Sequence, residues 1–94
     1  MNITNEMKLS FLSRSNNESF ARVAVAAFFA QLDPTVDEMA DIKTAVSEAV
    51  TNSIVHGYRE KIGVIYIHAK ILEDRTIAIK IRDNGCGIDD IKQA

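Results

Sequence analysis

Residues 63–83 read GVIYIHAKILEDRTIAIKIRD, and their alternating pattern sets the architecture of the chain. Apolar residues occupy every second position of its first half, at Ile65, Ile67, Ala69 and Ile71. The second half repeats the pattern with Ile77, Ile79 and Ile81. A period of two is the side-chain period of a β-strand. The polar residues 73–75 between the halves predict a turn, so the stretch is expected to form a β-hairpin.

The residues before the hairpin predict one strand and one helix. Met7, Leu9 and Phe11 alternate with more polar residues, which indicates a strand with one buried face. The spacing of Ser15 and Glu18 is that of a capping box and predicts a helix that begins near Asn16 and is stopped by the Asp33-Pro34 pair. The expected core face of this helix consists of Phe20, Val23, Ala24, Ala27 and Phe28.

A second helix is expected from Thr35 to about Val55, because Thr35 and Glu38 repeat the capping-box spacing. Apolar and small residues at helical spacing predict its core stripe: Met39, Ile42, Val46, Ala49, Val50 and Ser53. Polar residues fill the other side and are expected to face solvent: Asp37, Asp41, Lys43, Ser47 and Thr51.

The order β-α-α-β-β predicts an α+β fold, a two-layer sandwich with a mixed or antiparallel sheet and both helices on one face. Residues 89–94 are interpreted as the first turn of a further helix. A three-stranded sheet would leave its most apolar strand as an open edge, which folded proteins avoid. Residues 1–94 are therefore expected to be the N-terminal portion of one domain.

Composition excludes several classes of protein. The 94 residues carry a net charge of −2 and the basic residues form no run, which argues against a nucleic-acid surface. No apolar stretch approaches the roughly 20 residues of a membrane span. The single cysteine allows no internal disulfide and fits a reducing compartment. We expect a soluble cytoplasmic domain.

Glu48 and Asn52 are the first candidate functional residues. They stand four residues apart in the second helix, so both side chains project from one face, and His56 extends this polar line. A carboxylate can accept a proton, and an amide oxygen can bind a hard cation such as Mg²⁺. A solvated helix face is the alternative interpretation.

The second candidate is the segment 83–88, DNGCGI, which follows the hairpin. Gly85 and Gly87 allow a ligand to approach the backbone closely, although a simple turn has the same composition. Asp83 continues the inward alternation of its strand and needs a hydrogen-bond donor, for which the amino group of a purine is suitable. Cys86 is interpreted as a small loop residue. The sequence has no zinc-ligand spacing, no Gly-x-Ser-x-Gly motif and no Walker motif.

Residues 48–57 resemble the N box, and residues 83–88 the G1 box, of the GHKL superfamily of ATPases and kinases, to which gyrase, Hsp90, histidine kinases and MutL belong. Within that superfamily, residues 17–35 together with the N box resemble the anti-sigma serine kinases of sporulating bacteria. The resemblance covers nearly the whole chain and implies a GHKL-type (Bergerat) ATP-binding fold.

The resemblance also implies roles for individual residues. Glu48 would be the catalytic base and Asn52 the ligand of Mg²⁺. Asp83 would accept a hydrogen bond from adenine. The loop that contains Gly85 and Gly87 would close over ATP, and Ile88 would pack near the base.

The activity that follows from the resemblance is sequestration of a sigma factor and ATP-dependent phosphorylation of a serine of its anti-anti-sigma antagonist. A homodimer is implied as well. Arg22 is either a solvated charge or a contact to a partner protein. The alternatives are a nucleotide-dependent binding module without kinase activity and the catalytic domain of a sensor histidine kinase. The family's second glycine box and lid would follow residue 94, so the 94 residues alone are expected to be inactive.

Overall fold

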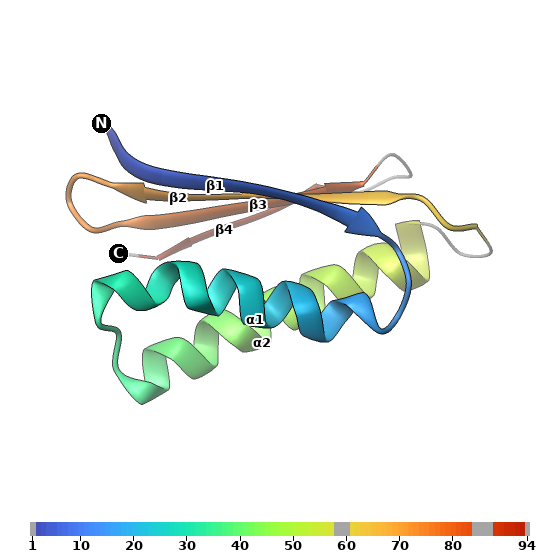
Figure 1. Ribbon diagram of the computed structural model, residues 1–94, viewed down its shortest axis with the longest axis horizontal. Coiled ribbons are helices and arrows are strands. Elements are labelled where there is room, and N and C mark those ends of the chain that lie inside the picture. The colour runs from blue at the N-terminus through green and yellow to red at the C-terminus, as the bar shows by residue number, and fades with distance from the viewer. Residues whose placement is uncertain (1, 58–60, 84–87, 94) are drawn as a thin grey trace.

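The computed structural model describes residues 2–57, 61–83 and 88–93, the last range by its backbone. Two helices lie on one face of a four-stranded sheet whose strand order is β1-β2-β3-β4 (Figure 1). The strands are β1 (Ile3–Leu12), β2 (Val64–Leu72), β3 (Ile77–Asp83) and β4 (Ile88–Gln93), and all neighbours are antiparallel. The predicted α+β sandwich is therefore confirmed.

The β2–β3 hairpin forms as predicted. Ile67 and Ile81 are register partners, and both side chains are fully buried or nearly so. Arg75 closes the turn with a φ of 69°, and its guanidinium Nη2 donates a hydrogen bond to the backbone oxygen of Leu32 at 2.6 Å. This contact ties the hairpin turn to the connection between the two helices.

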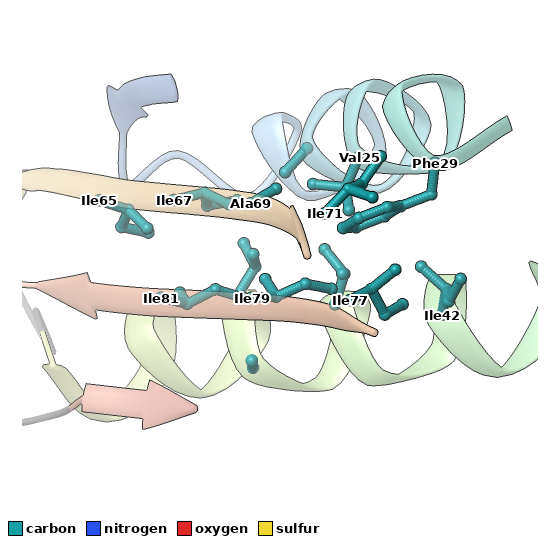
Figure 2. Close-up of a cluster of buried hydrophobic side chains, with 14 residues drawn as sticks. Val25, Phe29, Ile42, Ile65, Ile67, Ala69, Ile71, Ile77, Ile79 and Ile81 are labelled. Atoms are coloured by element: carbon teal, nitrogen blue, oxygen red, sulfur yellow. The ribbon is translucent and has the colours of Figure 1, made fainter. Parts of the chain in front are cut away.

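The core lies between the sheet and the helices. Figure 2 shows isoleucines from β2 and β3 pointing toward Val25 and Phe29 of α1 and Ile42 of α2. Met7, Leu9 and Phe11 of β1 pack against this core and are partly buried, as the alternation predicts.

Helix α1 (Asn17–Phe29) buries a different face from the expected one. Its buried residues are Ala21, Val25, Ala26 and Phe29. Of the predicted face, Phe20 and Val23 are 51% and 60% exposed. The prediction was wrong because residues 20–30 are apolar nearly all round the helix, so two stripes offset by one residue have similar spacing.

Helix α1 begins and ends close to the predicted positions, but its start is capped differently. Asn16 is the N-cap residue and makes no side-chain capping bond, so the predicted Ser15–Glu18 capping box does not form. A 3₁₀ turn, Ala30–Leu32, follows the helix, and Asp33 then takes a left-handed conformation with φ 51°. Aspartate tolerates that region better than most residues, so the chain turns before Pro34 as expected.

Helix α2 (Val36–Asn52) has the predicted capping box at Thr35. It also buries the predicted stripe, with Met39 only partly buried. Ser47 was predicted to face solvent, but it is half-buried. The α-helix ends three residues earlier than predicted and continues as a π-helical turn, Ser53–Gly57.

The segment after the hairpin corrects a further prediction. Residues 89–94 were expected to start a helix, whereas Ile88–Gln93 form β4 along β3. The physical reason is the open edge: β3 has unpaired backbone groups on that side, and β4 satisfies them.

Candidate functional site

The capping box fixes where α2 begins, and the buried stripe of the helix sets which residues face outward. The Glu38 N–H donates to the Thr35 hydroxyl at 3.1 Å, and the Thr35 N–H donates to the Glu38 carboxylate at 2.8 Å. The Thr35 backbone bond, followed by the bond to its hydroxyl, lowers the pKa of Glu38. With this start and the buried stripe facing the sheet, Glu48 and Asn52 lie together on the exposed side, one turn apart.

The π-helical turn changes the path of the chain directly after Asn52. The Ser53 N–H donates to the backbone oxygens of both Ala49 and Val50, and the Ser53 side chain is buried. A π turn holds more residues than the 3.6 of an α turn, so the step from Asn52 to His56 rotates less than it would in an α-helix. His56 therefore stays near the line of Glu48 and Asn52 and is exposed.

Asp83 is the last residue of β3 and the backbone partner of Ile65. It is half-buried and continues the alternation of Ile77, Ile79 and Ile81, which points it to the helix-covered side of the sheet. The π-helical turn contacts β3. The end of α2 and the end of β3 accordingly lie at the same end of the molecule (Figure 1).

The other predicted residues of the nucleotide loop are not placed. Gly85, Cys86 and Gly87 lie outside the described residues. Ile88 is the first residue of β4 and the backbone partner of Arg82, and its side chain lies outside the description as well.

Arg22 lies on α1, a different element from those that carry Glu48, Asn52 and Asp83. Its side chain is 39% exposed and forms a helical ion pair with Glu18, with 3.7 Å between the charged atoms. An exposed pair of this kind contributes at most a few tenths of a kcal/mol. The guanidinium is therefore available to a partner at little cost.

The candidate site supplies oxygen donors suited to Mg²⁺. The described residues contain no group of three or more His, Cys, Asp or Glu side chains that could hold a metal ion without other ligands. Mg²⁺ needs no such group, because it keeps several waters and takes one or two protein oxygens together with phosphate. The exposed amide of Asn52 beside the carboxylate of Glu48 fits that donor set.

Other cavities among the described residues lie away from this site. One of about 180 Å³ lies between the helix connection and the hairpin turn and is lined by Leu32, Pro34 and Arg75 among others. Another of about 360 Å³ opens on the sheet face that carries no helix. Sequence reasoning missed the second, although the alternation of β1, β2 and β3 already assigned its residues to one face.

Comparison with known proteins gives consistent matches. Residues 12–94 match the family described as the histidine kinase-like ATPase domain. A protein named anti-sigma F factor from Thermoanaerobacter pseudethanolicus is 63% identical over 94 residues, which is all of this chain and 65% of that protein. The anti-sigma F factor of Clostridium botulinum is 65% identical over 88 residues, 93% of this chain and 61% of the relative.

The chain thus spans about two-thirds of the length of these relatives. Among the residues that the structure describes, no helix has the length and apolar character needed to cross a bilayer. The family match covers nearly the whole chain and both segments that carry the candidate residues, α2 and the end of β3. The chain belongs to the histidine kinase-like ATPase domain family.

Proposed function

We propose that the complete protein is an ATP-dependent protein serine kinase that also acts as an anti-sigma factor. It would hold a sporulation sigma factor away from RNA polymerase and phosphorylate a serine of the anti-anti-sigma antagonist. The observation that carries the proposal is the position of Glu48 and Asn52 on one exposed side of α2, at the end of the molecule where β3 finishes at Asp83. The name of the relatives, anti-sigma F factor, supports the same function.

Glu48 is the catalytic base of the proposed reaction. Its carboxylate takes the proton of the serine hydroxyl, and the serine oxygen attacks the γ-phosphorus of ATP. The bond from that phosphorus to the oxygen bridging to the β-phosphate breaks, and ADP leaves with the electron pair. A base for a protein substrate must be reachable from solvent, and Glu48 is exposed.

Nucleotide and metal are assigned to the neighbouring residues. Asn52 is the proposed ligand of Mg²⁺, which supplies charge neutralisation at the phosphates. The half-buried Asp83 accepts a hydrogen bond from the adenine amino group. Gly85 and Gly87 let the loop backbone approach the nucleotide, and Ile88 packs near the base.

Partner contacts are proposed outside the nucleotide site. Arg22 on α1 would contact the sigma factor or the antagonist, since its only described ion pair is the weak one with Glu18. A homodimer is proposed through β1, which is an edge strand of the sheet. We place the protein in the cytoplasm, where sigma factors act.

The test is a Glu48→Gln variant of the full-length protein, incubated with γ-labelled ATP and the antagonist. We expect phosphoryl transfer to fall at least about 100-fold. The dissociation constant for Mg·ATP should stay unchanged, because glutamine keeps the size of the side chain. Asp41→Asn, an exposed change on the same helix outside the site, is the matched control.

Three outcomes separate the possible functions. Undiminished transfer by Glu48→Gln would refute the role of Glu48. ATP-dependent capture of the partner without any label would identify a binding module that uses nucleotide only as a structural ligand. Acid-labile label on histidine, in place of acid-stable phosphoserine, would identify a sensor kinase domain.

A further inference from the structure

The sheet face that carries no helix is basic. In the register of β1, β2 and β3, Lys8, His68 and Lys80 lie side by side in one row across the sheet. The neighbouring row on the same face consists of Ser10, Tyr66 and Arg82. Residues that are direct partners in antiparallel strands point to the same side, so both rows share one surface.

The charge of this face is opposite to that of the whole chain. Among the described side chains of the face, the basic residues Lys8, Lys70, Lys80 and Arg82 outnumber the single acid, Glu6. The chain as a whole has a net charge of −2. Several exposed acids, such as Asp37, Asp41 and Glu48, lie on α2, on the other side of the sheet. The fold therefore separates charge between its two layers.

The basic residues surround a depression rather than a flat surface. A cavity of about 360 Å³ is lined by Lys8, Ser10, Tyr66, His68, Lys80 and Arg82. The Arg82 guanidinium carbon lies 4.2 Å from the centre of the Tyr66 ring, a cation–π contact that holds this cation over the depression. His68 Nε2 lies 2.7 Å from a Glu6 carboxylate oxygen. Lys8, Lys80 and Arg82 thus line the depression.

The two lysines of the first row are close enough for one anionic segment to reach both. Lys8 and Lys80 both flank His68, and adjacent strands are about 4.8 Å apart, so the two lysine backbones are separated by only about 10 Å. Salt largely screens the repulsion between exposed charges at that separation, so the fold can keep these cations together. In the register, Lys70 has the acid Glu6 as its partner and Lys80 has Asp90. Lys8 has His68 as its partner, and Arg82 stacks on Tyr66, so neither of these two cations faces an acid across the strands.

We propose that this depression binds an acidic segment of a partner protein, a use of the sheet face that is independent of the nucleotide site. Two or three carboxylates of an extended peptide would lie between Lys8, Lys80 and Arg82. A second copy of this chain is a poorer occupant, because it would bring a face of the same sign. Nucleic acid is disfavoured by the net negative charge and by the small number of cations, since a duplex surface needs many phosphate contacts. A membrane surface would need protruding apolar or aromatic side chains, whereas this face is hollowed.

The test uses the full-length protein and a fluorescently labelled hexaglutamate peptide, with binding measured by fluorescence anisotropy at low salt. We expect Lys80→Glu to weaken binding about fivefold, because the exposed side chain loses an ion pair with the peptide. Lys43→Glu makes the same charge change on exposed α2 and serves as the matched control, which should bind the peptide as the unmodified protein does. Affinity should also fall as salt rises.

Several results would overturn the proposal. An equal loss of peptide affinity in Lys80→Glu and Lys43→Glu would show that only the net charge of the protein matters. Tighter binding of a single-stranded oligonucleotide or of vesicles with anionic lipid, lost in Lys80→Glu, would assign the face to nucleic acid or membrane. A loss of self-association in Lys80→Glu, measured by sedimentation without any peptide binding, would assign it to a second copy. Unchanged far-UV circular dichroism of both variants shows that the sheet is intact.

Discussion

Asn52 ends the α-helical part of α2, and its side chain is exposed beside that of Glu48. As the proposed ligand of Mg²⁺, it should matter only when the metal is present. We expect Asn52→Ala in the full-length protein to weaken binding of Mg·ATP about tenfold and to leave metal-free ATP binding unchanged, because one direct ligand of the cation is lost. Titration calorimetry with and without Mg²⁺ measures both affinities.

The neighbouring Thr51 provides the control, since it is exposed but lies outside the line of Glu48 and Asn52. Thr51→Ala should leave both affinities unchanged. Equal weakening with and without metal in Asn52→Ala would show that the amide does not bind the cation.

Ser47 carries a buried hydroxyl with no hydrogen-bond partner among the described residues. A buried polar atom without a hydrogen-bond partner destabilises the folded state, and alanine has no such atom. We expect Ser47→Ala to raise the free energy of unfolding by about 1 kcal/mol, measured by urea denaturation.

Alanine also has the higher helix propensity, so a serine exposed on a helix is needed for comparison. Ser19 on α1 is exposed and shows that contribution alone. A gain no larger in Ser47→Ala than in Ser19→Ala would mean that the Ser47 hydroxyl is satisfied in solution.

Among the secondary-structure elements, α1 has two apolar stripes, and substitutions can show which of them faces the sheet. Val25 is fully buried and Val23 is 60% exposed, so the same substitution probes both stripes. We expect Val25→Ala to lower the free energy of unfolding by about 2 kcal/mol, from lost burial and the cavity left behind. Val23→Ala should be neutral or slightly stabilising, because it removes little buried surface and improves helix propensity. Equal effects in urea denaturation would contradict the observed orientation of the helix.

The capping box of α2 predicts a dependence of stability on pH. The bonds from Thr35 lower the pKa of Glu38, so the folded state favours the ionised carboxylate. A lowered pKa contributes stability above the ordinary glutamate pKa of about 4.3, and this is lost as pH falls through the lowered value. The protein should therefore be more stable than Glu38→Gln at neutral pH, and the difference should disappear in acid.

Urea denaturation of both proteins across the acid range measures this difference. In a Thr35→Ala background, the substitution at Glu38 should show a smaller dependence on pH, because the Thr35 hydroxyl, the second cause of the lowered pKa of Glu38, is gone. A difference that stays constant from neutral to strongly acidic pH would refute the contribution of the capping box.

At the scale of the whole molecule, the chain holds the proposed base, metal and adenine residues but spans only 65% of a close relative's length. Phosphoryl transfer depends on positioning and charge neutralisation around the phosphates. The resemblance to the GHKL superfamily implies that a second glycine box and a lid, later in the chain, supply this positioning and charge neutralisation. We expect the 94-residue chain alone to transfer no phosphate, and a chain of the relatives' length to label the antagonist. Label transferred at equal rates by both chains would contradict this division of roles.

Much of the fold could be predicted from local pattern. The alternation around Ile67 and Ile81 predicts the hairpin because the side-chain period of a strand is two. Thr35 and Glu38 predict the start of α2, because their bonds lie within one turn. The spacing of Glu48 and Asn52 likewise places both on one face, and their roles remain a proposal.

Other features depend on contacts between distant segments. The apolar residues of α1 allow two buried faces, and only packing against β1 and α2 selects the one through Val25. The strand after Asp83 forms because β3 offers unpaired backbone groups, a property of the assembled sheet.

Local pattern is enough to predict the hairpin, the capped second helix and the line of polar residues on it, since each depends on groups within one turn or one strand. Long-range packing selects the buried face of α1, makes the chain after the hairpin a strand, and gathers scattered basic residues on one side of the sheet. The physical reason is that strand pairing and helix packing join residues far apart in the chain, and no local period contains that information.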